Sequence, residues 1–362
     1  MRKKIISILC CLMIAWLSYI GIRHHKNIHH LWYYISPIES YISQDMELII
    51  DTDTLNVLDS GYGDWLIHPC VRYIPEGLGG HKWWMSLTPY PEGNSKYEQP
   101  VLYYGVTNGD TPPSTWEYFG LIQDMHKSGY NADPNLYYDQ VSGKMIIVWK
   151  EAYTENTMGG AKFNALMCRT FDGYSFGKIL KLADNCDPDV EYITCPTLLP
   201  VGDSIFCFAT EFEYKRDSKK RLQHGRSNIA LWRPKNMNID SLSYIYCKCL
   251  KQEYPSSFDY WHTDFAYDSI SGFYYSVVTD EDGFSLLAGR SMDGFHYEYS
   301  EKPLKSFHDK QHERNIYKAS LVPTDNSIYV FYPKRLKGER RVHIYCAEFD
   351  RRSFENIFCE NE

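Results

Sequence analysis

The sequence has few charged residues and no excess of basic ones. Charged side chains make up 23% of the 362 residues, and the formal net charge is −8. Proteins that bind nucleic acid usually present a basic face, so this balance argues against a nucleic-acid partner. Hydrophobic residues make up 44% and aromatic residues 16%, including 31 Tyr and 9 Trp. This composition favours a large, strand-rich folded domain. Aromatic faces also suit stacking on sugar rings.

The cysteines lack the spacing of a metal site. Of the 11 cysteines, all but Cys10 and Cys11 lie beyond the first 30 residues, and their spacing fits no zinc motif. The sequence therefore predicts neither a metal nor another cofactor. Several cysteines lie inside apolar runs such as residues 206–208, which is typical of buried, unpaired thiols.

The N-terminus lacks the small residues of a signal-peptide cleavage site. Arg2, Lys3 and Lys4 precede an apolar run over residues 5–22, which is long enough to cross a bilayer. We therefore expect an uncleaved signal anchor within residues 1–30, with a cleaved signal as the alternative. The basic start favours the cytoplasm, so residues 31–362 are predicted to be membrane-anchored and exported, on the periplasmic or extracellular side.

One unit recurs along residues 31–362. A polar residue beside a Pro or a small residue begins an apolar strand, and a turn leads to a second, aromatic-rich strand. The copies recur at intervals of about 60 residues, which suits a four-stranded blade. They begin at His68, Asp133, Thr194, His262 and Lys318. The sequence therefore predicts an all-β fold, a five-bladed β-propeller.

Two further patterns support the blades. Asp172 with Gly173 and Asp293 with Gly294 each lie between strand-like segments and are predicted to turn from the third to the fourth strand of a blade. Residues 46–50 form a short apolar segment before the first blade. This segment could supply a closing strand to the last blade and so leave no exposed edge.

Polar residues recur where a propeller would bring them together. The first strand of each blade lines the central channel, and the loops between second and third strands lie on the same face. We therefore expect one pocket, with a polar rim that only keeps the channel mouth soluble as the alternative. The strand starts contribute His68, Asp133, His262, Asp264 and Lys318, and the loops contribute Tyr90, Glu98, Lys150, Glu211 and Arg226.

Most sugar hydrolysis requires two carboxylates that flank the glycosidic bond. The candidate catalytic residues are Asp133, Asp264, Glu211 and Glu98. The sequence leaves open which two stand at catalytic distance. A lysine beside a carboxylate would lower its pKa, and histidines could bind sugar hydroxyls or carry protons. The candidate substrate-binding residues are His68, His262, Tyr90, Lys150, Arg226 and Lys318.

Over roughly residues 60 to 350 the sequence resembles the five-bladed propeller glycosidases, which include glycoside hydrolase families 43 and 32. The resemblance implies an Asp that acts as general base at the first blade, where this chain has His68 before Pro69. It implies a second Asp that orients substrate, and Asp133 before Pro134 matches it. It also implies a Glu acid at the third blade, where Thr194 and Cys195 precede Pro196. The chain thus resembles a divergent subgroup.

Three functions are compatible with these observations. The first is a glycoside hydrolase-like propeller that acts on a poly- or oligosaccharide. The alternative is a non-catalytic glycan-binding or envelope polysaccharide assembly protein. The third is a propeller that binds other proteins. Asp133 is the strongest site candidate, and Pro134 after it predicts an extended backbone there. Asp133→Asn is expected to weaken glycan cleavage or binding by about tenfold while the melting temperature barely changes.

Overall fold

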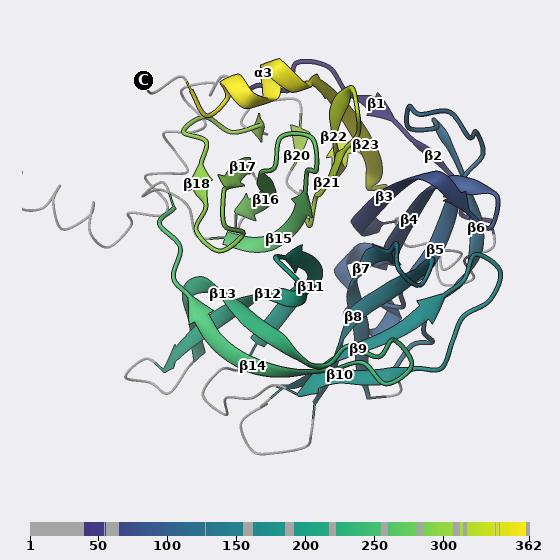
Figure 1. Ribbon diagram of the computed structural model, residues 1–362, viewed down its shortest axis with the longest axis vertical. Coiled ribbons are helices and arrows are strands. Elements are labelled where there is room, and N and C mark those ends of the chain that lie inside the picture. Colours follow the sequence, from purple (N-terminus) through teal and green to yellow (C-terminus); the bar gives the residue numbers. More distant parts are fainter. Residues whose placement is uncertain are drawn as a thin grey trace, which may run out of the picture.

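The computed structural model describes residues 40–53, 55, 65–126, 128–154, 162–184, 192–216, 222–254, 260–280, 285–306, 312–313, 317–336, 338–339 and 341–359. These residues form five sheets that surround a common centre, and each sheet has one inner strand nearest that centre (Figure 1). The predicted five-bladed, all-β propeller is confirmed. The predicted anchor over residues 5–22 lies outside the described residues. No helix among those described has the length and apolar character needed to cross a membrane.

Each blade runs outward from an inner strand. Blade 1 consists of β3 (Leu66–Leu78), β4 (His81–Pro89), β5 (Val101–Gly105) and β6 (Thr115–Leu121). Blade 2 consists of β7 (Gly129–Asp139), β8 (Lys144–Thr154), β9 (Lys162–Phe171) and β10 (Leu180–Asp184). Blade 3 consists of β11 (Tyr192–Val201), β12 (Ser204–Arg216), β13 (Leu222–Asn236) and β14 (Ser243–Leu250).

The last two blades carry additional short strands. Blade 4 consists of β15 (Tyr260–Tyr267), β16 (Tyr274–Asp280), β17 (Ser285–Ser291), β18 (Glu298–Tyr299) and β19 (Lys305–Ser306). Blade 5 consists of β20 (His312–Glu313), β21 (Ser320–Pro323), β22 (Ser327–Leu336) and β23 (His343–Asp350). A helix follows, α3 (Arg351–Asn356), and two 3-10 turns, η1 (Pro91–Gly93) and η2 (Ser95–Tyr97), connect β4 to β5.

The segment before the first blade closes the ring. Strand β1 (Met46–Glu47) pairs antiparallel with β23, and β2 (Ile49–Ile50) pairs parallel with β6. The predicted closing strand is therefore confirmed, and the same segment also reaches blade 1. Asp45 fixes its approach, because its carboxylate accepts hydrogen bonds from Tyr332 and from Lys334 Nζ at 2.9 Å. Burial alone would raise the pKa of Asp45, but these two donors hold it below its ordinary value.

The two Asp-Gly turns have the same construction. They join β9 to β10 and β17 to β18, so the predicted hairpins are confirmed. Asp172 Oδ1 accepts from the backbone N–H groups of the second and third residues after it, at 2.9 and 2.8 Å. Asp293 Oδ1 does the same at 2.8 Å twice. Gly173 and Gly294 have φ values of 96° and 78°, a left-handed conformation that glycine adopts without steric cost.

The blades pack through aromatic and aliphatic side chains, with Trp83, Trp84, Trp149 and Trp232 fully buried. Most of the described thiols belong to this core, as predicted; they are Cys70, Cys168, Cys195, Cys207 and Cys346. Burial raises the pKa of Cys168 to about 12. The prediction is wrong for Cys247 and Cys359, which are exposed at the outer edge and after α3.

Candidate functional site

Three inner strands begin with the same backbone irregularity. His68, Asp133 and Cys195 have φ values of 57°, 56° and 55°, and each precedes a proline. The pairing register shifts at each of these points, as in a β-bulge. A left-handed conformation costs a non-glycine residue about 1–3 kcal/mol and is concentrated at functional sites. The expected extended backbone at Asp133 is therefore wrong, because the bulge overrides the local preference of a residue before proline. The blade 3 equivalent is Cys195 rather than Thr194.

The bulges help to bring three potential ligands together from three blades. One ligand atom from each of His68, Asp133 and His262 lies within 4.8 Å of the other two. His68 Nε2 is 3.1 Å from Asp133 Oδ1, and the two imidazole centroids are 5.1 Å apart. All three side chains are buried, with exposed fractions of 5%, 1% and 5%. The cluster is therefore largely desolvated.

Asp133 is held as a charged carboxylate. Its Oδ2 is 2.8 Å from Lys150 Nζ and accepts hydrogen bonds from Thr194 Oγ1 and, at 3.4 Å, from the Cys195 backbone N–H. Burial opposes the charge, but the Lys150 ammonium, through its charge and its hydrogen bond, holds the pKa of Asp133 well below its ordinary value.

The two histidines are held neutral. Burial is the main reason that the pKa of His68 is lowered to about 4. The nearby Asp133 charge raises this pKa, whereas the Lys150 and Lys318 charges lower it further. Burial, together with the neighbouring His68, lowers the pKa of His262 well below its ordinary value. Lys318 is itself fully buried, and its Nζ donates to the Pro134 carbonyl at 2.8 Å. At neutral pH both imidazoles therefore keep a lone pair for a ligand.

The donor set fits a divalent metal ion. Asp133 Oδ1 lies 3.1 Å from His68 Nε2, yet within the described chain it has no hydrogen-bond partner. The two atoms are close but are not aligned for a hydrogen bond. This arrangement suits two ligand atoms that bind the same metal ion. Two neutral imidazoles and one carboxylate form the set found in catalytic metal sites with open coordination positions. Cysteine spacing could not reveal this cluster, because its members come from three separate blades.

An aromatic wall adjoins the cluster. The Tyr317 ring lies 5.9 Å from the His68 ring and 5.8 Å from the His262 ring. Tyr90 and Trp65 continue the wall, at centroid distances of 5.9 and 6.5 Å from Tyr317. The sequence analysis included Tyr90 but missed the other two. The available signal was position, since Tyr317 directly precedes a strand start and Trp65 directly precedes β3.

Glu98 belongs to this wall. It is buried and lies at the end of η2, in the loop between the second and third strands of blade 1. Burial raises the pKa of Tyr317 to about 12, and the Glu98 charge contributes to that rise. Burial and Glu98 also raise the pKa of Tyr90. The structure thus places this predicted carboxylate beside the aromatic side chains of the channel.

Asp264 belongs to a different network. Its carboxylate accepts from Asn135 Nδ2 at 2.7 Å, from Ser320 Oγ at 2.9 Å and from the Leu321 N–H at 3.3 Å. It also lies 3.5 Å from an Arg72 guanidinium nitrogen. These partners come from blades 1, 2 and 5, while Asp264 comes from blade 4. Its carboxylate therefore links blades rather than facing the histidines.

The remaining candidates are less well defined. Glu211 is buried on β12, opposite Ile193 of the inner strand β11. Arg226 lies on β13, and its side chain is outside the described part of the structure.

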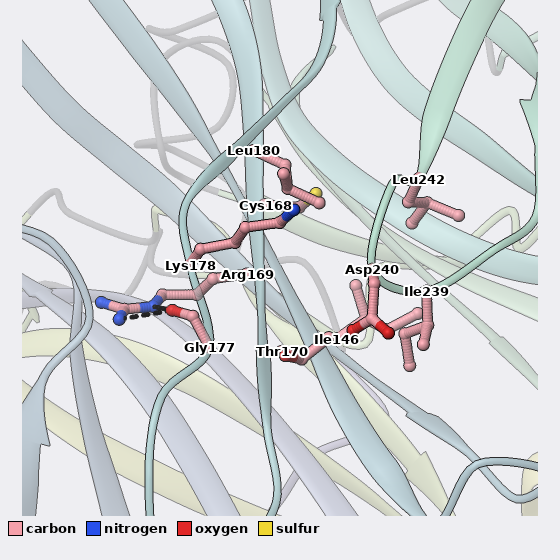
Figure 2. Close-up of a pocket in the computed structure, with 10 residues that line it drawn as sticks. All are labelled: Ile146, Cys168, Arg169, Thr170, Gly177, Lys178, Leu180, Ile239, Asp240 and Leu242. Carbon is pink, nitrogen blue, oxygen red and sulfur yellow. Dashed lines mark hydrogen bonds between the residues drawn. The ribbon is translucent and has the colours of Figure 1, made fainter.

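A second hollow lies away from the centre, between blades 2 and 3. It measures about 320 Å³ and is drawn in Figure 2. Arg169 at its edge is already engaged, because its guanidinium donates to the carbonyls of Gly177 and Ile122 at 2.7 Å each. Lys178 and Asp240 there are exposed. Functional sites typically contain buried titratable groups that shift one another's pKa. The His68–Asp133–His262 cluster has such groups, so we take it, rather than this hollow, as the candidate site.

Solved structures share this architecture, although no family model and no curated protein matches the sequence. An N-acetylgalactosamine deacetylase from F. plautii, in complex with blood group B trisaccharide, superposes with a TM-score of 0.66 at 16% identity. It covers 89% of this chain and 97% of its own. A xylan β-1,4-xylosidase from Bacillus halodurans gives a TM-score of 0.56 at 14% identity, over 80% of this chain and 54% of its own. The fold is that of the propeller glycosidases.

A third propeller of this kind is the family 32 β-fructofuranosidase from Bombyx mori. It superposes with a TM-score of 0.53 at 9% identity and covers 91% of this chain and 67% of its own. At such identities the likeness establishes the fold. The chemistry of this propeller has to be argued from its own side chains.

Proposed function

We propose that this propeller is a carbohydrate-active hydrolase that removes the acyl group from an N-acylated sugar at a divalent metal ion. His68, Asp133 and His262 would hold the metal. The observation that carries the proposal is their convergence from three blades, as two neutral imidazoles and one charged carboxylate. When bound there, a divalent metal supplies a Lewis acid and lowers the pKa of a coordinated water. This proposal replaces the sequence-based expectation of a site without metal.

The carboxylates support acyl hydrolysis better than direct glycoside cleavage. A glycosidase of the common type needs two carboxylates that flank the scissile bond. Asp133 is bound to Lys150, and Asp264 is bound across the blades. Among the predicted carboxylates, Glu98 is the one whose charge raises the pKa of Tyr317 on the aromatic wall. A metal site requires only one additional acid or base. The solved N-acetylgalactosamine deacetylase, which this chain matches over 97% of its length, is consistent with such chemistry.

The residues have separate roles in this proposal. A water oxygen bonds to the acyl carbon and the carbon–nitrogen bond breaks, while a proton passes from the water to the leaving nitrogen. Glu98 carries that proton. Lys150 keeps Asp133 ionised and oriented through its 2.8 Å contact. Trp65 and Tyr90, on the aromatic wall, stack against the sugar ring.

Glycoside cleavage is the second candidate. The shared fold with a xylosidase and a β-fructofuranosidase favours it, as does the buried Glu98 beside the wall. In that case Glu98 and Asp133 would be the pair to test. A protein that binds glycans without cleaving them is the remaining possibility, and the same experiment distinguishes the three.

The test uses the full-length protein loaded with Zn²⁺ or Mn²⁺ and a panel of N-acetylated and non-acetylated oligosaccharides. Released acetate and newly formed reducing ends are measured separately. We expect metal-dependent acetate release without chain shortening, and loss of both metal binding and acetate release in His68→Ala and His262→Ala. His296→Ala is the matched control, because that histidine is exposed on a turn. New reducing ends would favour the glycosidase, and binding without either product would favour the glycan-binding protein.

We also propose that the propeller is anchored in a membrane and faces away from the cytoplasm. The support comes from the basic residues 2–4 before the apolar run of residues 5–22. Protease added to cells with a permeable outer envelope should digest the propeller. Protection until the inner membrane is broken would overturn the assignment.

A further inference from the structure

Tyr317 stands where the potential metal ligands meet the aromatic wall. Its ring contacts both imidazoles, at centroid distances of 5.9 Å to His68 and 5.8 Å to His262. On its other side it contacts Tyr90 at 5.9 Å and Trp65 at 6.5 Å. A substrate that stacks on the wall and reaches the histidines must therefore pass beside this ring.

The position of Tyr317 is set by its neighbours in the fold. Thr279 Oγ1, on β16 of blade 4, donates to the Tyr317 carbonyl at 2.8 Å. The next residue, Lys318, is fully buried and donates to the Pro134 carbonyl in blade 2. These two contacts anchor the chain at Tyr317 and at the residue that follows it. Such fixed placement is what a preorganised catalytic group requires.

The Tyr317 hydroxyl is available to a ligand. The side chain is half-buried, and among the described residues its hydroxyl makes no hydrogen bond. Some other tyrosine hydroxyls are engaged, such as Tyr73 with Asp110 at 2.6 Å and Tyr345 with Glu47 at 3.0 Å. A phenol is neutral at physiological pH and can therefore donate.

We propose that Tyr317 is a catalytic residue whose hydroxyl donates a hydrogen bond to the carbonyl oxygen of the acyl group during hydrolysis. This inference rests on the proposed function. Negative charge develops on that oxygen as water adds to the acyl carbon, so a donor fixed beside it stabilises the transition state more than the ground state. Tyr317 keeps its proton throughout. The leaving nitrogen receives the proton that the water loses.

The test compares Tyr317→Phe with Tyr174→Phe in the full-length protein loaded with Zn²⁺. Phenylalanine keeps the ring contacts and removes only the hydroxyl, and Tyr174 is a control tyrosine exposed on the Asp172 turn, away from the site. We expect Tyr317→Phe to lower kcat for acetate release by about 10²–10³-fold with little change in KM. Affinity for acetate itself, measured by calorimetry, should fall by about tenfold, with unchanged affinity for Zn²⁺. Tyr174→Phe should change each quantity by less than about threefold.

Three outcomes would overturn the inference. If Tyr317→Phe matches Tyr174→Phe in both turnover and acetate affinity, the hydroxyl has no catalytic role. If Tyr317→Phe loses Zn²⁺, the ring only positions the histidines. If the wild-type protein binds Zn²⁺ but neither binds nor releases acetate, the proposed acyl hydrolysis is itself wrong and this inference fails with it.

Discussion

Asp133→Asn removes one negative charge and replaces one acceptor oxygen with an amide nitrogen in a site closed to solvent. Asp133 is 1% exposed and Lys150 is 2% exposed, and their charged groups are 2.8 Å apart. The variant therefore removes a carboxylate charge that lies 2.8 Å from a buried ammonium group. It also removes the only charged group among the three potential metal ligands.

The expected cost is large. Removing one partner of a buried ion pair typically costs about 3–5 kcal/mol, against a total unfolding free energy of about 5–15 kcal/mol. Sequence analysis alone predicted that the melting temperature would barely change. The structure replaces that expectation, because the carboxylate has a buried basic partner that the sequence did not pair with it. Loss of a residue that only hydrogen-bonds to a metal ligand can already lower metal affinity by up to about 100-fold. Because Asp133 is itself a potential ligand, its loss should lower metal affinity by more than that.

A double variant separates stability from function. Lys150→Met removes the ammonium group at similar length, so Asp133→Asn combined with Lys150→Met should recover most of the lost unfolding free energy. It should not recover Zn²⁺ binding. Urea unfolding measures the first quantity, and calorimetric Zn²⁺ titration measures the second. Lys150→Met alone is the control, since it retains all three potential ligands.

Two results would refute this reasoning. Unchanged Zn²⁺ affinity in a well-folded Asp133→Asn variant would remove Asp133 from the ligand set. A double variant no more stable than Asp133→Asn would show that the lost contact between Asp133 and Lys150 is not the source of the instability.

Three further predictions follow from the fold. Asp264→Asn should lower the unfolding free energy by about 3 kcal/mol in urea while leaving Zn²⁺ affinity unchanged, and wild-type stability would contradict the inter-blade role. The lowered pKa of Asp45 means that its stabilisation is present above the unfolded pKa of about 3.9 and is lost as pH falls below it. The difference in unfolding free energy between wild type and Asp45→Asn should therefore be largest near neutral pH and become small in acid. A difference that does not change with pH would disprove the assignment. A thiol reagent should label Cys247 and Cys359 in the native protein but reach Cys168 only after unfolding, with equal labelling rates as the contrary result.

Local patterns in the sequence determined the architecture. The recurring strand starts predicted five blades because each copy carries its own alternation of strand and turn. The hairpins at Asp172 and Asp293 were predictable because an Asx turn and a following glycine act within a few residues. The closing segment was also predictable, since a propeller has to protect its last edge.

Part of the candidate site was predictable for the same reason. Once the blades were counted, residues such as His68, Asp133 and His262 had to converge on the axis. Their chemistry was not predictable, because it depends on burial and on contacts between blades. Only the folded chain shows that the carboxylate of Asp133 is paired with Lys150 and that both histidines are neutral.

Tertiary structure also decided between carboxylates that look alike in the sequence. Asp133 and Asp264 both stand at strand starts, yet one faces the histidines and the other binds residues of all four other blades. Backbone conformation contributes to this difference, because the left-handed bulge at Asp133 redirects its side chain. The sequence alone determined that the strand starts converge at the centre, whereas the packing of one blade against the next determined which side chains face the site, their charge and their partners.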